Sequence, residues 1–484
     1  MSRDANDLLR EEGPDGLRHR FDAGGPRRGA GAGTLEVGSD QEVAGRVAND
    51  LRAAFGAAVF AEGAFHVWSG RAWRSLAGAE LHRFISAYDG RIYRGPDGKD
   101  RRFKVNKSIA QSVAYCLAQD LAAEDFFAGA PAGLNTRSGF LQVGDDGSIR
   151  SRAHAPDQRQ RHVLDADWHG DTLAHPPPGS ALHKLVTGCF RDDPEADAKA
   201  ALLSEILGVA AFGQATRLPS PKAIIFLGET AGNGKSQWLG LLKAVLPPGA
   251  VSAITPAELG QAQRRVQLAG KLLNASDELG EAAVRSDSFK AVITGDRVSG
   301  KTVFKEPVEF CPCALHVFAT NRLPPFSDGM DRGVRRRLLI VPFERTIPPK
   351  EQIAGLGAAV ARDELDLVLA WAIDGFKRVC LQGGFTEPAS GRAILSDWAL
   401  ASDPVAAFLT DPDVVEITGE RSDRLTTKQV YRRFQVWARE EGLQSVRTPD
   451  HGQFTRRVSA SAVPGVRVIR HGQRGREIVG LRLV

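Results

Sequence analysis

The chain has 484 residues, of which 42% are apolar, and a formal net charge of +5, so about three domains with hydrophobic cores are expected. No uninterrupted apolar run of about 18 residues occurs, so no membrane span is predicted, and residues 1–10 lack the apolar centre of a signal peptide. A cytoplasmic protein is therefore expected, and its five scattered cysteines indicate neither a disulfide framework nor zinc binding.

The N-terminal third divides into a leader and a domain. Residues 1–34 are rich in Gly, Arg and Asp, which predicts a disordered leader. Residues 40–165 predict a mixed α/β domain that begins with a helix near Asp40. A hairpin over 65–73 follows, with a Ser-Gly turn. Its two tryptophans, Trp68 and Trp73, are interpreted as packing residues rather than platforms for nucleobases.

A helical collar is predicted over residues 180–220. A Pro-rich breaker at 175–179 precedes two helical segments, 181–190 and 196–211. The second segment is apolar on most sides, which predicts that it is buried. These helices lead directly into the segment with the strongest motif.

Residues 221–345 alternate strands and helices, which predicts an α/β core with a central parallel sheet. The apolar strand 223–227 is followed by a glycine-rich turn that ends in Lys-Ser, and then by a helix. Glycines let backbone N–H groups point at an anion, and the helix N-terminus adds positive charge. This order is typical of a phosphate-binding loop.

The loop predicts ATP and Mg²⁺ as cofactors. Lys235 is expected to reach the β- and γ-phosphates and Ser236 to hold Mg²⁺. The residues predicted to bind the nucleotide are Gly228, Gly232, Asn233, Gly234, Lys235, Ser236 and Gln237. The usual spacing places a glycine where this chain has Glu229, with Gly228 one residue further back. The alternative is a glycine-rich turn that binds nothing.

Adjacent acids follow the next predicted strand. Asp277 and Glu278 end an apolar segment, at the sheet edge where ligands of α/β folds bind. We expect Asp277 in the Mg²⁺ shell and Glu278 to activate the attacking water. The alternative is a surface Asp-Glu pair.

A basic hairpin is predicted over 298–304, with Ser299 and Gly300 near its tip and Lys301 and Lys305 close by. Such a hairpin is suited to grip a phosphodiester backbone. The alternative is an exposed basic turn.

Two further motifs complete the core. The apolar strand 315–319 leads to Asn321, whose amide can sense the γ-phosphate or orient the water. An arginine cluster then precedes the last strand, and Arg336 and Arg337 are predicted to complete the site of a neighbouring subunit in a ring. The alternative is a solvated cluster.

The C-terminal part is predicted to be a helical lid over 350–385 and a winged-helix DNA-binding domain over 400–484. Helices are followed by strands around 471–475. Residues 421–484 carry 14 Lys and Arg against 5 Asp and Glu, a local charge of +9, which leaves the rest of the chain at −4. This distribution predicts a polyanionic partner.

Together, these motifs resemble the superfamily 3 helicases, and more closely the phage and plasmid replication proteins related to the poxvirus primase-helicase. The motifs are Gly-Asn-Gly-Lys-Ser (232–236), Ala-Ser-Asp-Glu-Leu (275–279), Phe-Lys-Ala-Val-Ile-Thr-Gly-Asp (289–296), Phe-Ala-Thr-Asn-Arg-Leu-Pro (318–324) and Arg-Arg-Leu-Leu-Ile-Val-Pro-Phe (336–343). The C-terminal helix with Tyr431 and Trp437 and the closing segment 479–483 resemble the winged-helix end of that family.

The resemblance implies an AAA+-type P-loop ATPase core, a homo-hexameric ring and ATP-driven translocation on single-stranded DNA in a bacterial host cell. It also implies a DNA-gripping role for Lys301 and Lys305, duplex DNA as a second partner, and primase or replication-initiation partners. Many relatives carry a primase domain, but residues 40–165 are too short for one, so no primer synthesis is predicted. The alternative functions are a regulatory or defence ATPase that binds or opens DNA without processive unwinding and, less favoured, a small-molecule kinase.

Overall fold

The computed structural model describes residues 34–144, 146–277, 279, 282–301, 307–326, 330–441, 449–461, 463–471 and 475–484. The chain divides into two compact units. The first comprises residues up to Gly144, Ser148–Asp167 and Val308–Phe310, and the second comprises Asp145–Gly147, Trp168–Pro307 and Cys311–Val484. The predicted leader falls almost entirely outside the described residues.

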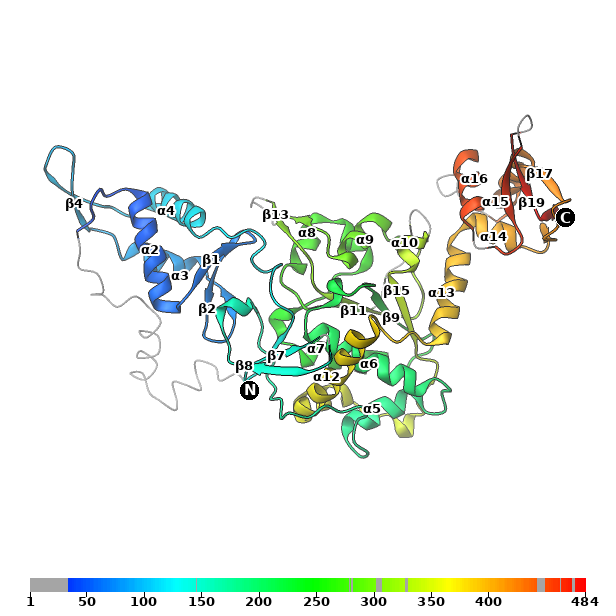
Figure 1. The fold of residues 1–484 in the computed structure, drawn as a ribbon, viewed down its shortest axis with the longest axis horizontal. Helices are drawn as coiled ribbons and strands as arrows, with labels where there is room; N and C mark the ends of the chain where they lie inside the picture. Colours follow the sequence, from blue (N-terminus) through cyan, green and yellow to red (C-terminus); the bar gives the residue numbers. More distant parts are fainter. Residues whose placement is uncertain are drawn as a thin grey trace. The chain divides into compact units, whose positions relative to one another are not determined.

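The first unit is a mixed α/β structure (Figure 1). Its elements are α2 (Asp40–Phe55), β1 (Ala58–Ala61), β2 (Ala64–Trp68), β3 (Trp73–Ser75), α3 (Gly78–Ser86), β4 (Ile92–Arg94), β5 (Asp100–Arg102), α4 (Lys107–Asp120), β6 (Leu134–Asn135), β7 (Phe140–Val143) and β8 (Ile149–Arg152). All of its strand pairs are antiparallel within the described residues.

The predicted start of the first unit is confirmed. The Ser39 side chain caps α2 by accepting from the Glu42 N–H, and α2 buries Val43 and Val47. Trp68 and Trp73 face each other across the β2–β3 hairpin with ring centroids 6.1 Å apart. Their exposed fractions are 9% and 4%, so both are packing residues, as predicted.

The second unit is built on a five-stranded parallel sheet with the order β10-β11-β14-β9-β15. The strands are β9 (Ala223–Leu227), β10 (Val251–Ser252), β11 (Leu273–Asp277), β14 (Leu315–Thr320) and β15 (Leu338–Pro342). The predicted parallel α/β core is confirmed. Strands β14 and β15 are buried along their full length, as strands of a parallel sheet covered on both faces should be, although β14 includes the polar residues His316 and Thr320.

Helices accompany the sheet (Figure 1). They are α5 (Ala181–Phe190), α6 (Ala196–Ala211), α7 (Lys235–Val245), α8 (Ala262–Arg265), α9 (Ser286–Thr294), α10 (Arg332–Arg335), α11 (Leu356–Asp363) and α12 (Leu365–Gln382). Helices α6 and α12 cross so closely that a Cβ atom on Gly208 would lie 2.2 Å from the Ala372 carbonyl oxygen. On the facing helix, a Cβ on Gly375 would lie 2.3 Å from the Ser204 backbone. Glycines therefore permit this helix pair.

The C-terminal segment contains α13 (Ala389–Ser402), α14 (Pro404–Thr410), β16 (Val415–Ile417), β17 (Arg424–Thr426), α15 (Thr427–Glu440), α16 (His451–Ala460), β18 (Arg467–His471), β19 (Gly475–Val479) and β20 (Leu481–Leu483). A core of aromatic and aliphatic side chains, including Phe408, Phe434 and Phe454, joins its helices and strands. The predicted hairpin around 471–475 is confirmed by the antiparallel pairing of β18 with β19.

The final predicted strand is interrupted. Gly480 has a φ of +87°, which ends β19 and redirects the chain. Strand β20 then pairs with β16 instead of continuing beside β18. In the part of the chain that the structure describes, no helix combines the length and apolar character needed to cross a membrane.

Candidate functional site

The polar motifs meet at one edge of the parallel sheet. The register aligns Asp277 of β11 with Ala319 of β14, and Ala319 with Phe226 of β9. The residues that follow these positions, including Gly228 and Asn321, therefore leave the sheet at its carboxyl edge. Strand β14 lies between β9 and β11, so Asn321 emerges between the glycine-rich loop and the acidic strand.

The loop after β9 depends on its glycines. Gly232 and Gly234 have φ values of +70° and +92°, which favour glycine, and Gly234 caps α7. Gly228 is needed for a different reason, since a Cβ there would lie 2.2 Å from the Asn233 Nδ2 atom. Glu229, the residue at the unusual spacing, is exposed, so the loop accommodates it by turning it outward.

Lys235 joins the loop to Asn321. Its Nζ atom donates to the Gly228 carbonyl oxygen at 2.6 Å and to the Asn321 Oδ1 atom at 2.9 Å. Both acceptors are neutral, and within the described residues no carboxylate pairs with this ammonium. Burial lowers the pKa of Lys235. A buried cation held only by neutral oxygens is suited to receive an anion.

The loop also packs against the collar helix α5. A Cβ on Gly234 would lie 2.3 Å from the Cys189 Sγ atom, and burial raises the pKa of that thiol to about 12. Beside this contact is a cavity of about 670 Å³. Its lining combines loop residues with apolar and charged side chains, among them Gly232, Gln237, Leu185, Ile347, Leu356 and Arg345. A cavity of mixed apolar and charged lining beside an anion cradle is suited to a nucleoside with attached phosphates.

Three other residues predicted to bind the nucleotide or Mg²⁺ are exposed or contact residues outside the loop. Ser236 is exposed at the first turn of α7, and Gln237 uses its Oε1 atom to accept from the Gly357 N–H at 3.0 Å. Asp277 is ion-paired with Lys243 of α7 at 3.1 Å, and among the described residues no hydrogen bond joins it to Ser236. Glu278 lies outside the described residues.

Arg336 and Arg337 lie at the opposite edge of the sheet. Leu338, the residue after them, aligns with Ala223 at the start of β9, and the Arg337 carbonyl oxygen accepts from the Ala223 N–H at 2.7 Å. The length of β9, about 13 Å at 3.3 Å per residue, separates them from the loop. The structure therefore does not bring these arginines to Lys235 of the same chain.

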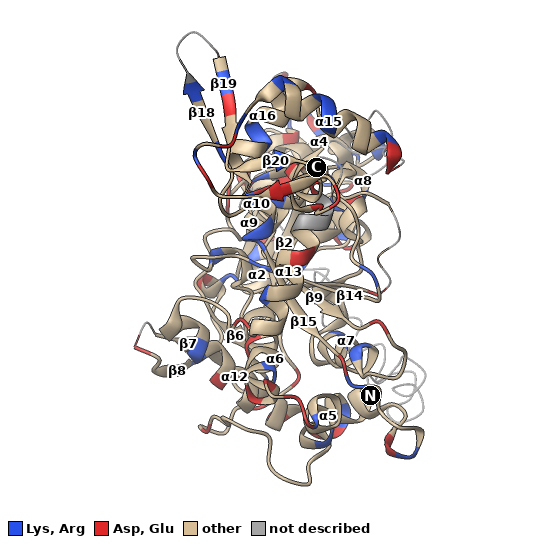
Figure 2. Ribbon diagram, turned by 90° about the vertical axis from the view of Figure 1, so that its right-hand side faces the viewer, with Lys and Arg blue, Asp and Glu red and all other residues tan. Residues whose placement is uncertain are grey.

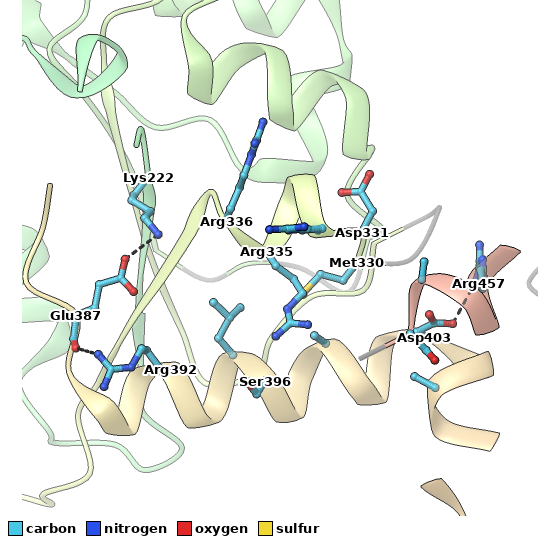
Figure 3. Close-up of a pocket in the computed structure, with 16 residues that line it drawn as sticks. Lys222, Met330, Asp331, Arg335, Arg336, Glu387, Arg392, Ser396, Asp403 and Arg457 are labelled. Atoms are coloured by element: carbon cyan, nitrogen blue, oxygen red, sulfur yellow. Dashed lines mark hydrogen bonds and ion pairs between the residues drawn. The ribbon is translucent and has the colours of Figure 1, made fainter. Parts of the chain in front are cut away.

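The two arginines differ in their surroundings. Arg337 is partly buried, donates from Nη1 to the Gly333 carbonyl oxygen at 2.7 Å, and burial lowers its pKa. Arg336 is exposed and lines a cavity of about 860 Å³ with Lys222, Met330 and Arg335. Figure 3 shows Arg336 extending away from α13, while Lys222 pairs with Glu387 at 2.8 Å. Arg336 is therefore the freer of the two to meet another molecule.

The basic hairpin differs from its prediction. Ser299 and Gly300 lie within the strand β12 (Val298–Gly300), so they are part of a strand and not of a turn. A Cβ on Gly300 would lie 2.8 Å from the Val266 Cα atom, so close backbone approach, not a turn, requires this glycine. Lys301 is exposed directly after β12, and Lys305 lies outside the described residues.

Sequence reasoning missed the partners of the loop. Cys189 lies 45 residues before Gly234 in the chain, and no local pattern connects them. The pairing of Lys243 with Asp277 could have been predicted more readily than the contact with Cys189. Lys243 lies two helical turns after Lys235, on a helix beside the strand that ends in Asp277.

Comparisons with known proteins add one family match. Residues 226–337 match a family described as "Family of unknown function (DUF5906)". This segment contains all the predicted site residues. No curated protein matches the chain significantly.

Among solved structures, the chain is similar to one described as "The A form apo structure of NrS-1 C terminal region-CTR", at 13% identity and a TM-score of 0.42, with 88% of this chain and 96% of that chain covered. A second, "The apo structure of NrS-1 C terminal region (305-718)", has 13% identity and a TM-score of 0.40, with coverages of 87% and 94%. Similarity this low carries no argument about function, which rests on the residues of this chain.

Proposed function

We propose that this protein is an ATP-dependent DNA helicase that serves the replication of a phage, prophage or plasmid and moves on single-stranded DNA as a ring. The observation that carries the proposal is Lys235, a buried ammonium held by Gly228 and Asn321 at the edge where Asp277 also ends its strand. This arrangement supports an AAA+-type P-loop ATPase core.

The loop residues have separate tasks in this proposal. Bound MgATP supplies the phosphoryl group whose transfer to water releases the energy for movement. Lys235 gives up its neutral acceptors and pairs with phosphate oxygens. Gly232 and Gly234 let backbone N–H groups face the same anion. Ser236 and Asp277 supply the oxygen atoms suited to Mg²⁺, which requires Asp277 to leave Lys243. Glu278 orients the attacking water, and Asn321 keeps that water in position relative to Lys235.

A neighbouring copy completes the site. Because Arg336 lies a strand length away from the loop of its own chain, it serves the loop of the next subunit, where its charge stabilises the departing phosphoryl group. Arg337 is tied back to Gly333 and supports the position of Arg336. This division of the site between copies favours a closed ring.

The C-terminal segment supplies DNA contacts as a winged-helix domain. Figure 2 shows Lys and Arg on α15, α16, β18 and β19. On the β18–β19 hairpin, Arg470 lies directly opposite Arg476, and both are exposed. Like charges in directly opposed positions are destabilising, and a DNA phosphate between them relieves that repulsion. Lys301 supplies a further contact to the single strand.

The test is ATP hydrolysis with and without single-stranded DNA, together with strand displacement. Lys235→Ala should abolish hydrolysis because no other buried cation is placed at the loop in the described structure. Lys377→Ala, which removes a partly exposed lysine from α12, is the control and should keep the wild-type rate. Hydrolysis that survives in Lys235→Ala would refute the site assignment.

Strand displacement separates the proposal from its main alternative. DNA-stimulated hydrolysis with displacement of a long duplex supports the helicase. Stimulation without displacement supports a regulatory ATPase that binds or opens DNA. A rate of hydrolysis that DNA does not change contradicts both the helicase and the regulatory ATPase.

A further inference from the structure

The β4–β5 ribbon of the first unit is strongly basic. Residues 91–107 carry seven Lys and Arg against two Asp. Figure 1 shows that the loop beyond β4 extends away from α2 and α4 within this unit. All of these cations except Arg91 are exposed. The ribbon belongs to neither the loop site nor the C-terminal segment.

The packing of alternate residues fixes which face of the ribbon is turned outward. Phe103 is buried and Val105 packs against the same hydrophobic core, so Arg102 and Lys104 between and beside them point to solvent. The antiparallel register places Ile92 opposite Arg102 and Arg94 opposite Asp100. The outward face therefore presents Arg94, Arg102 and Lys104, with Asp100 as its single acid.

The base of the ribbon is firmly held. The Gly90 N–H donates to the Phe103 carbonyl oxygen at 2.7 Å, and the Phe103 N–H donates to the Arg91 carbonyl oxygen at 2.8 Å. On the inward face, the Tyr93 ring covers Gly38, where a Cβ would lie 2.4 Å from the ring. The outward cations are thus displayed on a pre-formed support, which lowers the entropy cost of binding.

The cations of this face lack acidic partners. Arg101 pairs with Asp97 at 3.3 Å, but it lies on the other face. Arg102 and Lys104 form no ion pair with any residue that the structure describes, and the Arg94 Nε atom donates only to a carbonyl oxygen, that of Gly98. Three cations without an ion pair, on a face that carries one acid, are suited to an external polyanion.

We propose that this outward face of the β4–β5 ribbon binds duplex DNA. A two-stranded antiparallel ribbon fits the major groove, which is about 12 Å wide. Residues two apart on one face of a strand are about 6.8 Å apart, roughly the through-space distance between neighbouring phosphates along one strand of B-DNA, so Arg102 and Lys104 can reach two successive phosphates of one DNA strand. The site goes beyond the proposed ATPase and does not depend on it.

The experiment measures binding of the full-length protein to a fluorescent duplex without nucleotide, across a series of salt concentrations. Arg102→Ala/Lys104→Ala should weaken binding on the order of tenfold at 0.1 M salt and reduce the salt slope by about 1.8, since each lost phosphate contact contributes about 0.9. Asp100→Asn should tighten binding, because it removes the only acid from the face.

Arg52→Ala/Arg83→Ala is the matched control. It removes two exposed arginines from α2 and α3 of the same unit and should leave the affinity and slope unchanged. Thermal unfolding checks that each variant is folded. The proposal is overturned if the ribbon variant binds duplex like the control, or if Asp100→Asn does not tighten binding. Loss of ATP hydrolysis in a separate assay would leave this result unaffected, so the two proposals fail independently.

Discussion

At the scale of single residues, His316 is a buried titratable group with one ring nitrogen left without a partner in the described structure. Its ring lies within β14 at 1% exposure, and Asn274 donates from Nδ2 to its Nδ1 atom at 3.1 Å. The other ring nitrogen, Nε2, has no partner in the described structure. Burial lowers the pKa of His316 to about 3, so the folded protein holds a neutral imidazole.

This burial predicts a pH-dependent stability. An unfolded His has a pKa of about 6.5, so below that pH the unfolded chain binds a proton that the folded chain excludes. The stability is complete above about pH 6.5 and falls by about 1.4 kcal/mol per pH unit as the pH drops towards 3. Burial, followed by the charge of Arg161, lowers the pKa of His66 to about 4, so His66 adds a similar loss in part of that window.

Urea unfolding between pH 7 and pH 5 measures the effect. His316→Asn keeps an acceptor for Asn274 and does not titrate, so its stability should depend on pH less steeply than that of the wild type by one proton. His82→Asn, at an exposed histidine, should keep the wild-type slope. Equal slopes in the wild type and His316→Asn would contradict the assignment.

At the scale of elements, the α6–α12 pair joins the collar to the lid. Glu205 of α6 is buried, accepts from the Thr386 N–H at 2.7 Å and pairs with Arg378 at 3.2 Å. The helices approach closely because Gly208 and Gly375 have no side chains at the crossing. This contact fixes the collar against α12.

Gly208→Ala should destabilise the protein by about 3 kcal/mol, because the added Cβ meets backbone rather than a flexible side chain. Gly240→Ala is the matched control. Gly240 lies within α7 and a Cβ there meets nothing within 4 Å, so the change should be neutral or stabilise by up to about 1 kcal/mol. The denaturant midpoint of each variant measures its stability. Equal midpoints for Gly208→Ala and Gly240→Ala would show that helices α6 and α12 can move apart without loss of stability.

Local patterns predicted most elements but not their partners. The bounds of α5 and α6 match the predicted 181–190 and 196–211, since a Ser180 cap and long apolar stretches mark them. Helix α13 begins at Ala389, between the predicted lid over 350–385 and the predicted domain over 400–484, so no prediction covers its start. Helix α16 was also missed, although Asp450 and Gln453 form a capping box that could have located it.

The same limit applies within the site. Lys235 and Asn321 could be predicted from the order of strands and motifs, but their direct contact depends on β14 lying beside β9. Asn274, which interrupts an apolar strand, is a structural tether, because its Oδ1 atom accepts from the Ile254 N–H at 2.8 Å. Such long-range pairings leave no local signal in the sequence.

At the scale of the whole molecule, the sheet separates the two halves of the proposed catalytic site. Lys235 follows the carboxyl end of β9, whereas Arg336 precedes the amino end of β15. The proposed function therefore requires at least two copies of the chain, with the arginine of one facing the loop of the next.

Mixing two inactive variants tests this arrangement. Lys235→Ala and Arg336→Ala should each lose hydrolysis when alone. When they are mixed, some interfaces combine an intact Lys235 with an intact Arg336, so part of the wild-type rate should return. Lys235→Ala mixed with the double variant Lys235→Ala/Arg336→Ala is the control and should stay inactive. No recovery in the first mixture, with assembly shown by light scattering, would place both residues in one subunit's site or remove Arg336 from it.

The opposite placement of lysine and arginine also has a kinetic consequence. In the proposed function, a site shared between two copies would make the specific activity rise with protein concentration, so dilute, dispersed subunits would hydrolyse no ATP. A DNA molecule that gathers several subunits would raise their local concentration and thereby start hydrolysis where the substrate for movement is present. The geometry of one sheet would in this way confine fuel consumption to assembled complexes on DNA, without a separate inhibitory domain.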